Sequence, residues 1–205
     1  MTLLGGPMQP VNLANRITIA RFLLIPLFIL LLSYYIEDAR HGIILPALKN
    51  GALAVFIIAA LSDALDGFIA RRFHQTTSLG RFLDPIADKM LVAAAIVMLS
   101  IWEVPGLHRF PLWYPILIFS RDLMLLIGSV VLHVLCARVE VRPHIVGKAS
   151  TALNLVAVIA AIVCVPWLPC APIVWIAGAF TACSAILYFF DGIRQLHGVP
   201  EKPQP

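Results

Sequence analysis

Four aspartates, Asp63, Asp66, Asp84 and Asp88, lie inside or beside two apolar runs that are long enough to cross a bilayer. An ionised carboxylate is costly in hydrocarbon, so such residues usually mark a functional site. The first two are three residues apart and the last two are four apart, and on helices each pair shares one face. Two such pairs facing each other provide hard oxygen ligands for Mg²⁺, Mn²⁺ or Ca²⁺. We therefore predict a divalent metal site.

The residues around these aspartates favour a phosphate ligand. Gly67 directly follows the first pair, and Gly80 lies one helical turn before the second. Because glycine has no Cβ, a bulky ligand can approach the backbone at both positions. Arg71 and Arg72 supply positive charge that phosphate oxygens accept well. A metal, open space and a cation together indicate phosphoryl chemistry.

The composition is that of a membrane protein. Of the 205 residues, 60% are hydrophobic and 13% are charged, whereas soluble domains contain about 25% charged residues. The net charge of +4 does not indicate a nucleic-acid partner. We expect one membrane domain over residues 12–197, with a flexible tail at 1–11 and a second tail at 198–205.

Hydropathy predicts an all-α integral membrane protein with six transmembrane helices and a short N-terminal interfacial helix. An outer loop is expected at 37–49, and Asp84 and Pro85 are expected to open the third span as N-cap and first helical residue. Lysine and arginine concentrate on the side of the N-terminus, which places the aspartates at the cytoplasmic face. The predicted spans are 17–35, 51–72, 84–102, 114–136, 149–165 and 173–190.

The stretch 63–88 resembles the signature of the CDP-alcohol phosphatidyltransferases. It reads D-A-L-D-G-x-x-A-R, then eight residues, a glycine, three residues, an aspartate, three residues and a final aspartate. Asn12, Thr18 and Arg21 at the start of the first span, and the Gly147-Lys148 element, resemble bacterial phosphatidylglycerophosphate synthases of that family. The resemblance covers nearly the whole chain.

The resemblance implies a reaction in which CDP-diacylglycerol gives its phosphatidyl group to an alcohol and CMP leaves. It implies two divalent ions, Mg²⁺ or Mn²⁺, bound by Asp63, Asp66 and Asp84, with Asp88 as general base and further metal ligand. It also implies a homodimer in the bilayer, here the bacterial inner membrane with the active site facing the cytoplasm. The residues implied to bind the liponucleotide are Asp66, Gly67, Ala70, Arg71 and Gly80.

The acceptor alcohol is open between two candidates. Arg21, Lys148 and Arg121 are candidates for binding it, although the first two also fit the positive-inside bias and Arg121-Asp122 also fits a structural ion pair. Ser120-Arg121-Asp122 is closer to cardiolipin synthases that accept phosphatidylglycerol, and Ser129 stands where the glycerophosphate enzymes have a second arginine. The first-span and Gly-Lys elements favour glycerol 3-phosphate, which we expect to be the acceptor.

Two other classes of protein compete with this interpretation. An ion-coupled transporter also uses intramembrane aspartates, but it predicts broken helices and inverted repeats that the sequence does not show. A structural membrane subunit gives no reason for four aspartates. The cysteines form no CxxC or zinc spacing, and a disulfide between Cys164 and Cys170 stays open.

Overall fold

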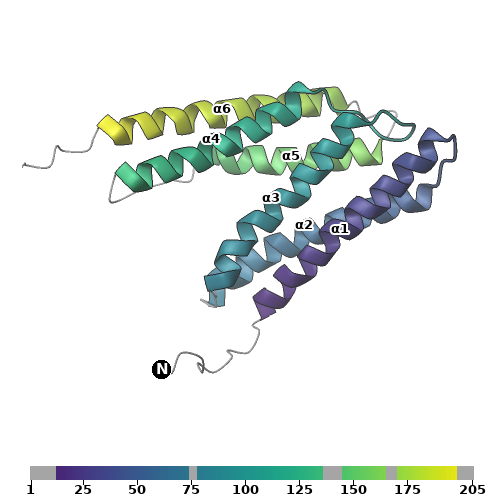
Figure 1. The fold of residues 1–205 in the computed structure, drawn as a ribbon, viewed down its shortest axis with the longest axis horizontal. Helices are drawn as coiled ribbons and strands as arrows, with labels where there is room; N and C mark the ends of the chain where they lie inside the picture. Colours follow the sequence, from purple (N-terminus) through teal and green to yellow (C-terminus); the bar gives the residue numbers. More distant parts are fainter. Residues whose placement is uncertain (1–12, 74–77, 136–144, 165–169, 198–205) are drawn as a thin grey trace, which may run out of the picture. The chain divides into compact units, whose positions relative to one another are not determined.

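The computed structural model describes residues 13–73, 78–135, 145–164 and 170–197, and within them it contains six α-helices and no strands (Figure 1). The all-α class is therefore confirmed, and the six helices correspond to the six predicted apolar runs. The chain divides into two compact units, Met1–Ala95 and Ile96–Pro205. The helices are α1 Leu13–Arg40, α2 Pro46–Phe73, α3 Ser78–Ile101, α4 Trp113–Leu135, α5 Ile145–Val163 and α6 Cys170–His197.

In the first unit, α1 packs lengthwise against α2. Buried residues recur along α1 at helical spacing and form one face, which includes Ile25, Phe28 and Leu32. The ring of Phe28 meets the ring of Phe56 in α2 with centroids 5.4 Å apart. Ala59, one turn later on α2, is fully buried, and small residues of this kind let two helices approach closely.

The connection between α1 and α2 is shorter than the loop predicted at 37–49. Helix α1 continues to Arg40 and α2 begins at Pro46, so only 41–45 connect them. The N–H of Ile43 donates to the carbonyl of Asp38 at 2.9 Å, and that of Gly42 donates to Ala39 at 3.1 Å. Gly42 has φ +81°, the left-handed conformation that closes a helix in this way and that glycine adopts without strain.

From Leu13 onward, the structure shows no separate N-terminal interfacial helix. Helix α1 runs without interruption from Leu13 to Arg40, with Pro26 inside it. No glycine or proline lies between residues 13 and 25, so the sequence contains no breaker that would separate an interfacial segment from the span.

The prediction that Asp84 caps the third span is wrong. Helix α3 begins six residues earlier, at Ser78, and the backbone is already helical at Asp84 and Pro85. Serine is favourable at a helix start, and the residues that follow continue the helix. Pro85 forgoes one hydrogen bond to the carbonyl of residue 81, a loss that membrane helices tolerate.

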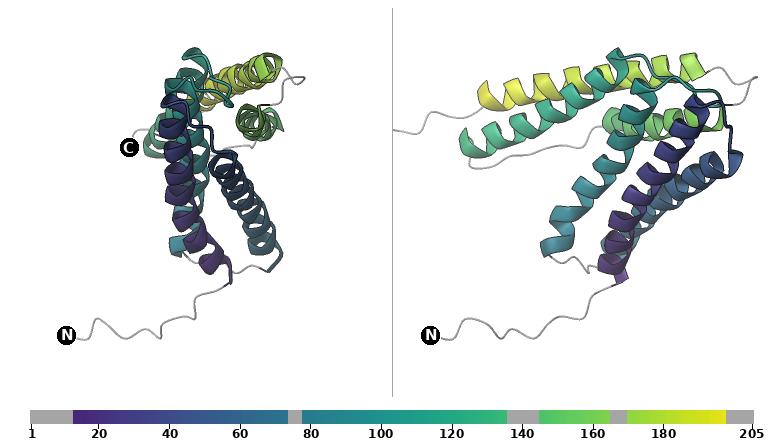
Figure 2. Two further views of the ribbon diagram at one scale, coloured as in Figure 1. Left: turned by 90° about the vertical axis from the view of Figure 1, so that its right-hand side faces the viewer. Right: turned by 45° about the vertical axis from the view of Figure 1, so that its right-hand side comes forward.

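In the second unit, α4 and α5 both pack against α6 (Figure 2). The segment before α4 is held by backbone bonds, because the N–H of His108 donates to Ala161 at 3.0 Å and that of Phe110 donates to Leu99 at 2.9 Å. Helix α4 begins within one residue of its predicted start, whereas α5 and α6 begin several residues earlier than predicted. Because α5 begins at Ile145, Gly147 and Lys148 lie in its first turn.

Two stretches among the described residues are long and apolar enough to cross a membrane, Ile145–Val163 and Cys170–Ile193. Apolar side chains also cover outward faces of the other helices. Leu23 of α1 is 70% exposed and Ile116 of α4 is 66% exposed. Large apolar residues on the outside and on the inside of the same helix are typical of helices surrounded by lipid.

Candidate functional site

The four predicted metal-binding aspartates lie near the connection between α2 and α3. Asp63 and Asp66 are in the last turns of α2, and Asp84 and Asp88 are in the first turns of α3. Because the backbone is helical at all four positions, the spacing of three and of four residues places each pair on one helix face. Their side chains lie outside the described part of the structure, so the predicted metal cage stays a prediction.

The link between these two helices is short. Only residues 74–77 separate Phe73, the last residue of α2, from Ser78, the first of α3, so the two helix ends are at most about 18 Å apart. Four further positions predicted to bind the liponucleotide also lie on these helical segments, namely Gly67, Ala70, Arg71 and Gly80. The structure does not describe the surroundings of these four residues either.

The first unit also contains Arg21, one of the predicted acceptor-binding residues. It lies in α1, and its side chain is fully buried. A guanidinium carries five N–H donors and no acceptor, so a buried arginine requires hydrogen-bond partners or a ligand.

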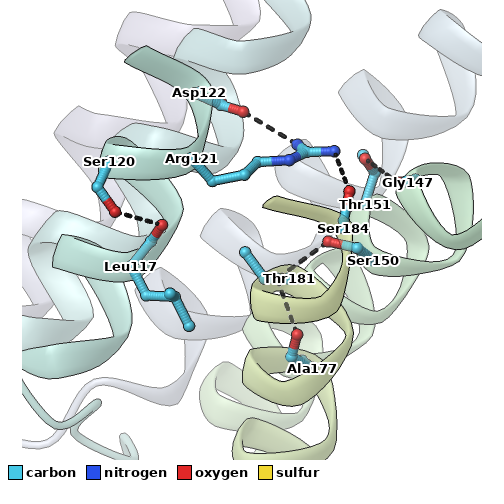
Figure 3. Close-up of polar contacts among 10 residues, drawn as sticks. All are labelled: Leu117, Ser120, Arg121, Asp122, Gly147, Ser150, Thr151, Ala177, Thr181 and Ser184. Atoms are coloured by element: carbon cyan, nitrogen blue, oxygen red, sulfur yellow. Dashed lines mark hydrogen bonds and ion pairs between the residues drawn. The ribbon is translucent and has the colours of Figure 1, made fainter. Parts of the chain in front are cut away.

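The second unit contains Arg121, which projects from α4 into a polar cluster (Figure 3). Its side chain is 11% exposed, and its Nη1 lies 3.0 Å from Oδ1 of Asp122. Its Nη2 donates to Oγ of Ser184 on α6 at 3.2 Å. Its Nε is buried and has no hydrogen-bond partner among the residues that the structure describes. Leaving a buried donor unsatisfied costs about 1–3 kcal/mol, and more when the donor is charged, so this nitrogen is a candidate contact for an anion.

The predicted Gly147-Lys148 element lies beside this arginine. Gly147 is buried in the first turn of α5, and a Cβ there would lie 3.4 Å from Nη2 of Arg121 and 3.1 Å from the hydroxyl of Tyr188. Lys148 is exposed. The unbonded N–H groups of a first helical turn carry a partial positive charge. A partly buried arginine, a lysine and a helix N-terminus thus lie in one region of this unit.

Buried hydroxyl groups fix the three helices around Arg121. Ser150 on α5 and Thr181 on α6 form a hydrogen bond of 2.9 Å, and Thr181 also donates to the carbonyl of Ala177 at 2.8 Å (Figure 3). The hydroxyl of Tyr114 on α4 donates to Oδ1 of Asn154 on α5 at 2.9 Å. These bonds connect α5 to both of its neighbours, through side chains in a mostly apolar interior.

Sequence reasoning missed Ser184 and Tyr188. Both lie in an apolar span, far along the chain from Arg121, and neither residue type is unusual there. One signal was available, since Thr181, Ser184 and Tyr188 follow one another at spacings of three and four residues. This spacing places the polar groups of α6 on one face, which is the face that meets α4 and α5.

The structure answers the open question of the Cys164–Cys170 disulfide, and it tests the predicted metal ligands only in part. Cys164 and Cys170 are both free thiols, so the disulfide between them is not formed. Within the described ranges no group of three histidine, cysteine or acidic side chains could hold a metal ion. The four aspartates are not among those side chains.

Comparison with known proteins identifies the family. The family model described as CDP-alcohol phosphatidyltransferase matches residues 11–190. A Bacillus subtilis protein named CDP-diacylglycerol–glycerol-3-phosphate 3-phosphatidyltransferase is 33% identical over 189 residues, which cover 87% of this chain and 93% of that protein. A Mycobacterium tuberculosis protein named probable phosphatidylglycerophosphate synthase is 35% identical over 156 residues, or 76% of this chain and 68% of that protein.

Another relative has a higher sequence identity over a shorter stretch. A Pseudomonas fluorescens protein with the same name as the Bacillus protein is 47% identical over 88 residues, which cover 43% of this chain and 40% of that protein. The chain belongs to the CDP-alcohol phosphatidyltransferase family. The resemblance that stretch 63–88 indicates is therefore confirmed.

Proposed function

We propose that this enzyme transfers the phosphatidyl group of CDP-diacylglycerol to sn-glycerol 3-phosphate, giving phosphatidylglycerophosphate and CMP. The observation that carries the proposal is the near full-length similarity to a Bacillus relative named for that donor and acceptor. The alternative acceptor, phosphatidylglycerol, rests on the Ser120-Arg121-Asp122 element. None of the three relatives described above is named for it.

The chemistry follows from the residue types. The acceptor hydroxyl attacks the phosphorus that bears diacylglycerol, the bond from that phosphorus to the bridging oxygen breaks, and CMP leaves with the oxygen and its electron pair. Asp88 accepts the hydroxyl proton. Burial and neighbouring like charges raise the basicity of a carboxylate towards a useful value.

The donor set fits a divalent cation, since two carboxylate pairs on two linked helices are hard oxygen ligands. Asp63, Asp66 and Asp84, with Asp88, would hold two Mg²⁺ or Mn²⁺ ions. Ions bound there would neutralise charge on the diphosphate and on the leaving CMP. Gly67, Ala70, Arg71 and Gly80 form the liponucleotide site in this proposal.

We assign the acceptor phosphate to Arg121 and Lys148, with Arg21 as a further candidate. The support is the partly buried and partly bonded guanidinium of Arg121, whose Nε has no hydrogen-bond partner among the described residues. Guanidinium and phosphate form directional, charge-assisted hydrogen bonds. Phosphatidylglycerol presents a phosphodiester with one charge, and it fits a site with several cations less well than a phosphate monoester does.

The same proposal includes six membrane spans with the N-terminus and the aspartates at the cytoplasmic face, and a homodimer. The excess of lysine and arginine on one side supports the orientation. A membrane-impermeant maleimide should label a cysteine introduced at position 43 from outside intact cells. A cysteine introduced at position 202 should react only after the membrane is opened.

The deciding experiment uses purified protein in detergent with CDP-diacylglycerol. Release of CMP should require Mg²⁺ or Mn²⁺, should stop with EDTA, and should be fast with glycerol 3-phosphate. Phosphatidylglycerophosphate should be the lipid product by mass spectrometry. Formation of cardiolipin from added phosphatidylglycerol, without any phosphatidylglycerophosphate from glycerol 3-phosphate, would show that the proposed acceptor is wrong.

A further inference from the structure

The guanidinium of Arg121 is held at two of its three nitrogens by groups on different helices. Asp122, on its own helix α4, lies 3.0 Å from Nη1, and Ser184, on α6, lies 3.2 Å from Nη2. Adjacent residues of a helix project about 100° apart, so Asp122 alone constrains Arg121 from one side only. The bond to Ser184 fixes the second nitrogen and thereby the plane of the group.

Ser184 is suited to this role because it cannot move independently of the helix bundle. Its side chain is fully buried. One turn earlier on α6, Thr181 is bonded to Ser150 of α5 at 2.9 Å, which fixes the register of α6 against α5. The hydroxyl of Ser184 is therefore presented to Arg121 from a rigid position.

Helix α5 lies close to Nη2 of Arg121, the nitrogen that donates to Ser184. A Cβ at Gly147 would lie 3.4 Å from Nη2 of Arg121, so the backbone of α5 already lies close to the guanidinium. Ser184 and the α5 backbone lie beside Nη2, and Asp122 lies beside Nη1, so each terminal nitrogen has a polar neighbour in this cluster and Nε does not. This buried nitrogen has no partner within the described part of the chain.

We propose that Ser184 is a specificity-determining positioning residue, which orients Arg121 so that its open donor meets the phosphate of the acceptor alcohol. This inference rests on the proposed function. An arginine that keeps its charge but loses its fixed plane still attracts anions, but it loses the directional bonds that recognise a phosphate. The enzyme then discriminates less well between glycerol 3-phosphate and uncharged glycerol.

The test measures Ser184→Ala and the nearly isosteric Ser184→Cys, whose sulfur is only a weak acceptor. We expect the KM for glycerol 3-phosphate to rise about tenfold in both, while the KM for CDP-diacylglycerol and the rate with saturating acceptor stay within about twofold. The preference for glycerol 3-phosphate over glycerol should fall by the same factor of about ten. If the alanine variant does not fold, the cysteine variant decides.

The matched control is Ser100→Ala. Ser100 is also buried in the second unit, and its hydroxyl donates to the carbonyl of Ile96 at 2.6 Å, so its loss should leave both KM values unchanged. An unchanged KM for glycerol 3-phosphate in the Ser184 variants, or an equal rise for both substrates, would overturn the inference while leaving the proposed function in place. A wild-type enzyme that does not use glycerol 3-phosphate would overturn both.

Discussion

The indole ring of Trp113 at the start of α4 lies directly over Gly178 of α6. A Cβ on Gly178 would come within 2.7 Å of Cζ3 and 2.8 Å of Cη2 of that ring. The ring also packs against Trp175, one turn earlier on α6, with centroids 4.7 Å apart and the two ring planes tilted by 33°. The absence of a side chain at Gly178 is therefore what allows α4 and α6 to approach closely at this end of the second unit.

Gly178→Ala should destabilise the fold. The added methyl group overlaps a large ring that is held by Trp175, so we expect a loss of about 1–3 kcal/mol in the free energy of unfolding. Thermal unfolding in detergent, followed by circular dichroism, measures the change. The KM for glycerol 3-phosphate should not change in the folded fraction.

Gly51→Ala is the matched control for this substitution. It also lies inside a helix, but among the side chains that the structure describes a Cβ there would meet only Cδ1 of Leu31, at 3.6 Å, an ordinary contact. Alanine is the better helix former by about 1 kcal/mol, so this variant should be as stable as the wild type or more stable. Equal destabilisation by both substitutions would show that the ring over Gly178 is not the cause.

Asp88→Asn should abolish turnover and leave the binding of CDP-diacylglycerol largely intact. Asparagine keeps the shape of the side chain but cannot accept the hydroxyl proton, and loss of a general base lowers rates by about 10²–10⁴. CMP release gives the rate, and a binding assay with labelled CDP-diacylglycerol gives the affinity.

The control for Asp88→Asn is Asp38→Asn near the end of α1. The carbonyl of Asp38 that closes this helix belongs to the backbone and is kept, so activity should stay unchanged. If Asp88→Asn instead loses the liponucleotide together with the activity, Asp88 is chiefly a metal ligand.

Lys148→Ala should raise the KM for glycerol 3-phosphate by about tenfold, because one charge-assisted contact to a phosphate is lost. The KM for CDP-diacylglycerol should stay the same. Initial rates at varied acceptor concentration measure both constants. Lys49→Ala, at the start of α2, removes a lysine at the opposite predicted face and should leave both unchanged. An unaltered acceptor KM in Lys148→Ala would remove this lysine from the acceptor site.

Gly147→Ala should also raise the acceptor KM, by displacing Arg121. Its Cβ would lie 3.1 Å from the hydroxyl of Tyr188 and 3.4 Å from Nη2 of Arg121. Tyr188 must then give by a few tenths of an ångström, while the added methyl group comes into contact with the guanidinium. Small displacements of a binding group reduce its effect, and we expect a rise of about threefold to tenfold.

A matched helix glycine is available for comparison with Gly147. Among the described residues, a Cβ on Gly128 of α4 would have no heavy atom of another helix within 4 Å, so Gly128→Ala should leave the acceptor KM unchanged. If Gly147→Ala and Gly128→Ala have the same acceptor KM, crowding at Gly147 does not act on Arg121.

Local signals predicted much of this protein. Apolar runs located all six helices, and the spacing of Asp63, Asp66, Asp84 and Asp88 indicated the family that the comparisons confirm. The helix boundaries were less accurate, because they depend on local details such as the hydrogen bonds that close α1 at Gly42. The pair Asp84-Pro85 looked like a helix start, yet the helix begins at Ser78.

By itself the sequence determined the class of protein and its chemistry, because the cost of charge in an apolar run and the period of a helix are both local properties. It also singled out Arg121 and Gly147-Lys148, but not what surrounds them. Only the tertiary structure placed the guanidinium of Arg121 between Asp122, Ser184 and the backbone of Gly147. Contacts between residues that lie 63 positions apart depend on how helices pack, and neither composition nor spacing along the chain encodes that packing directly.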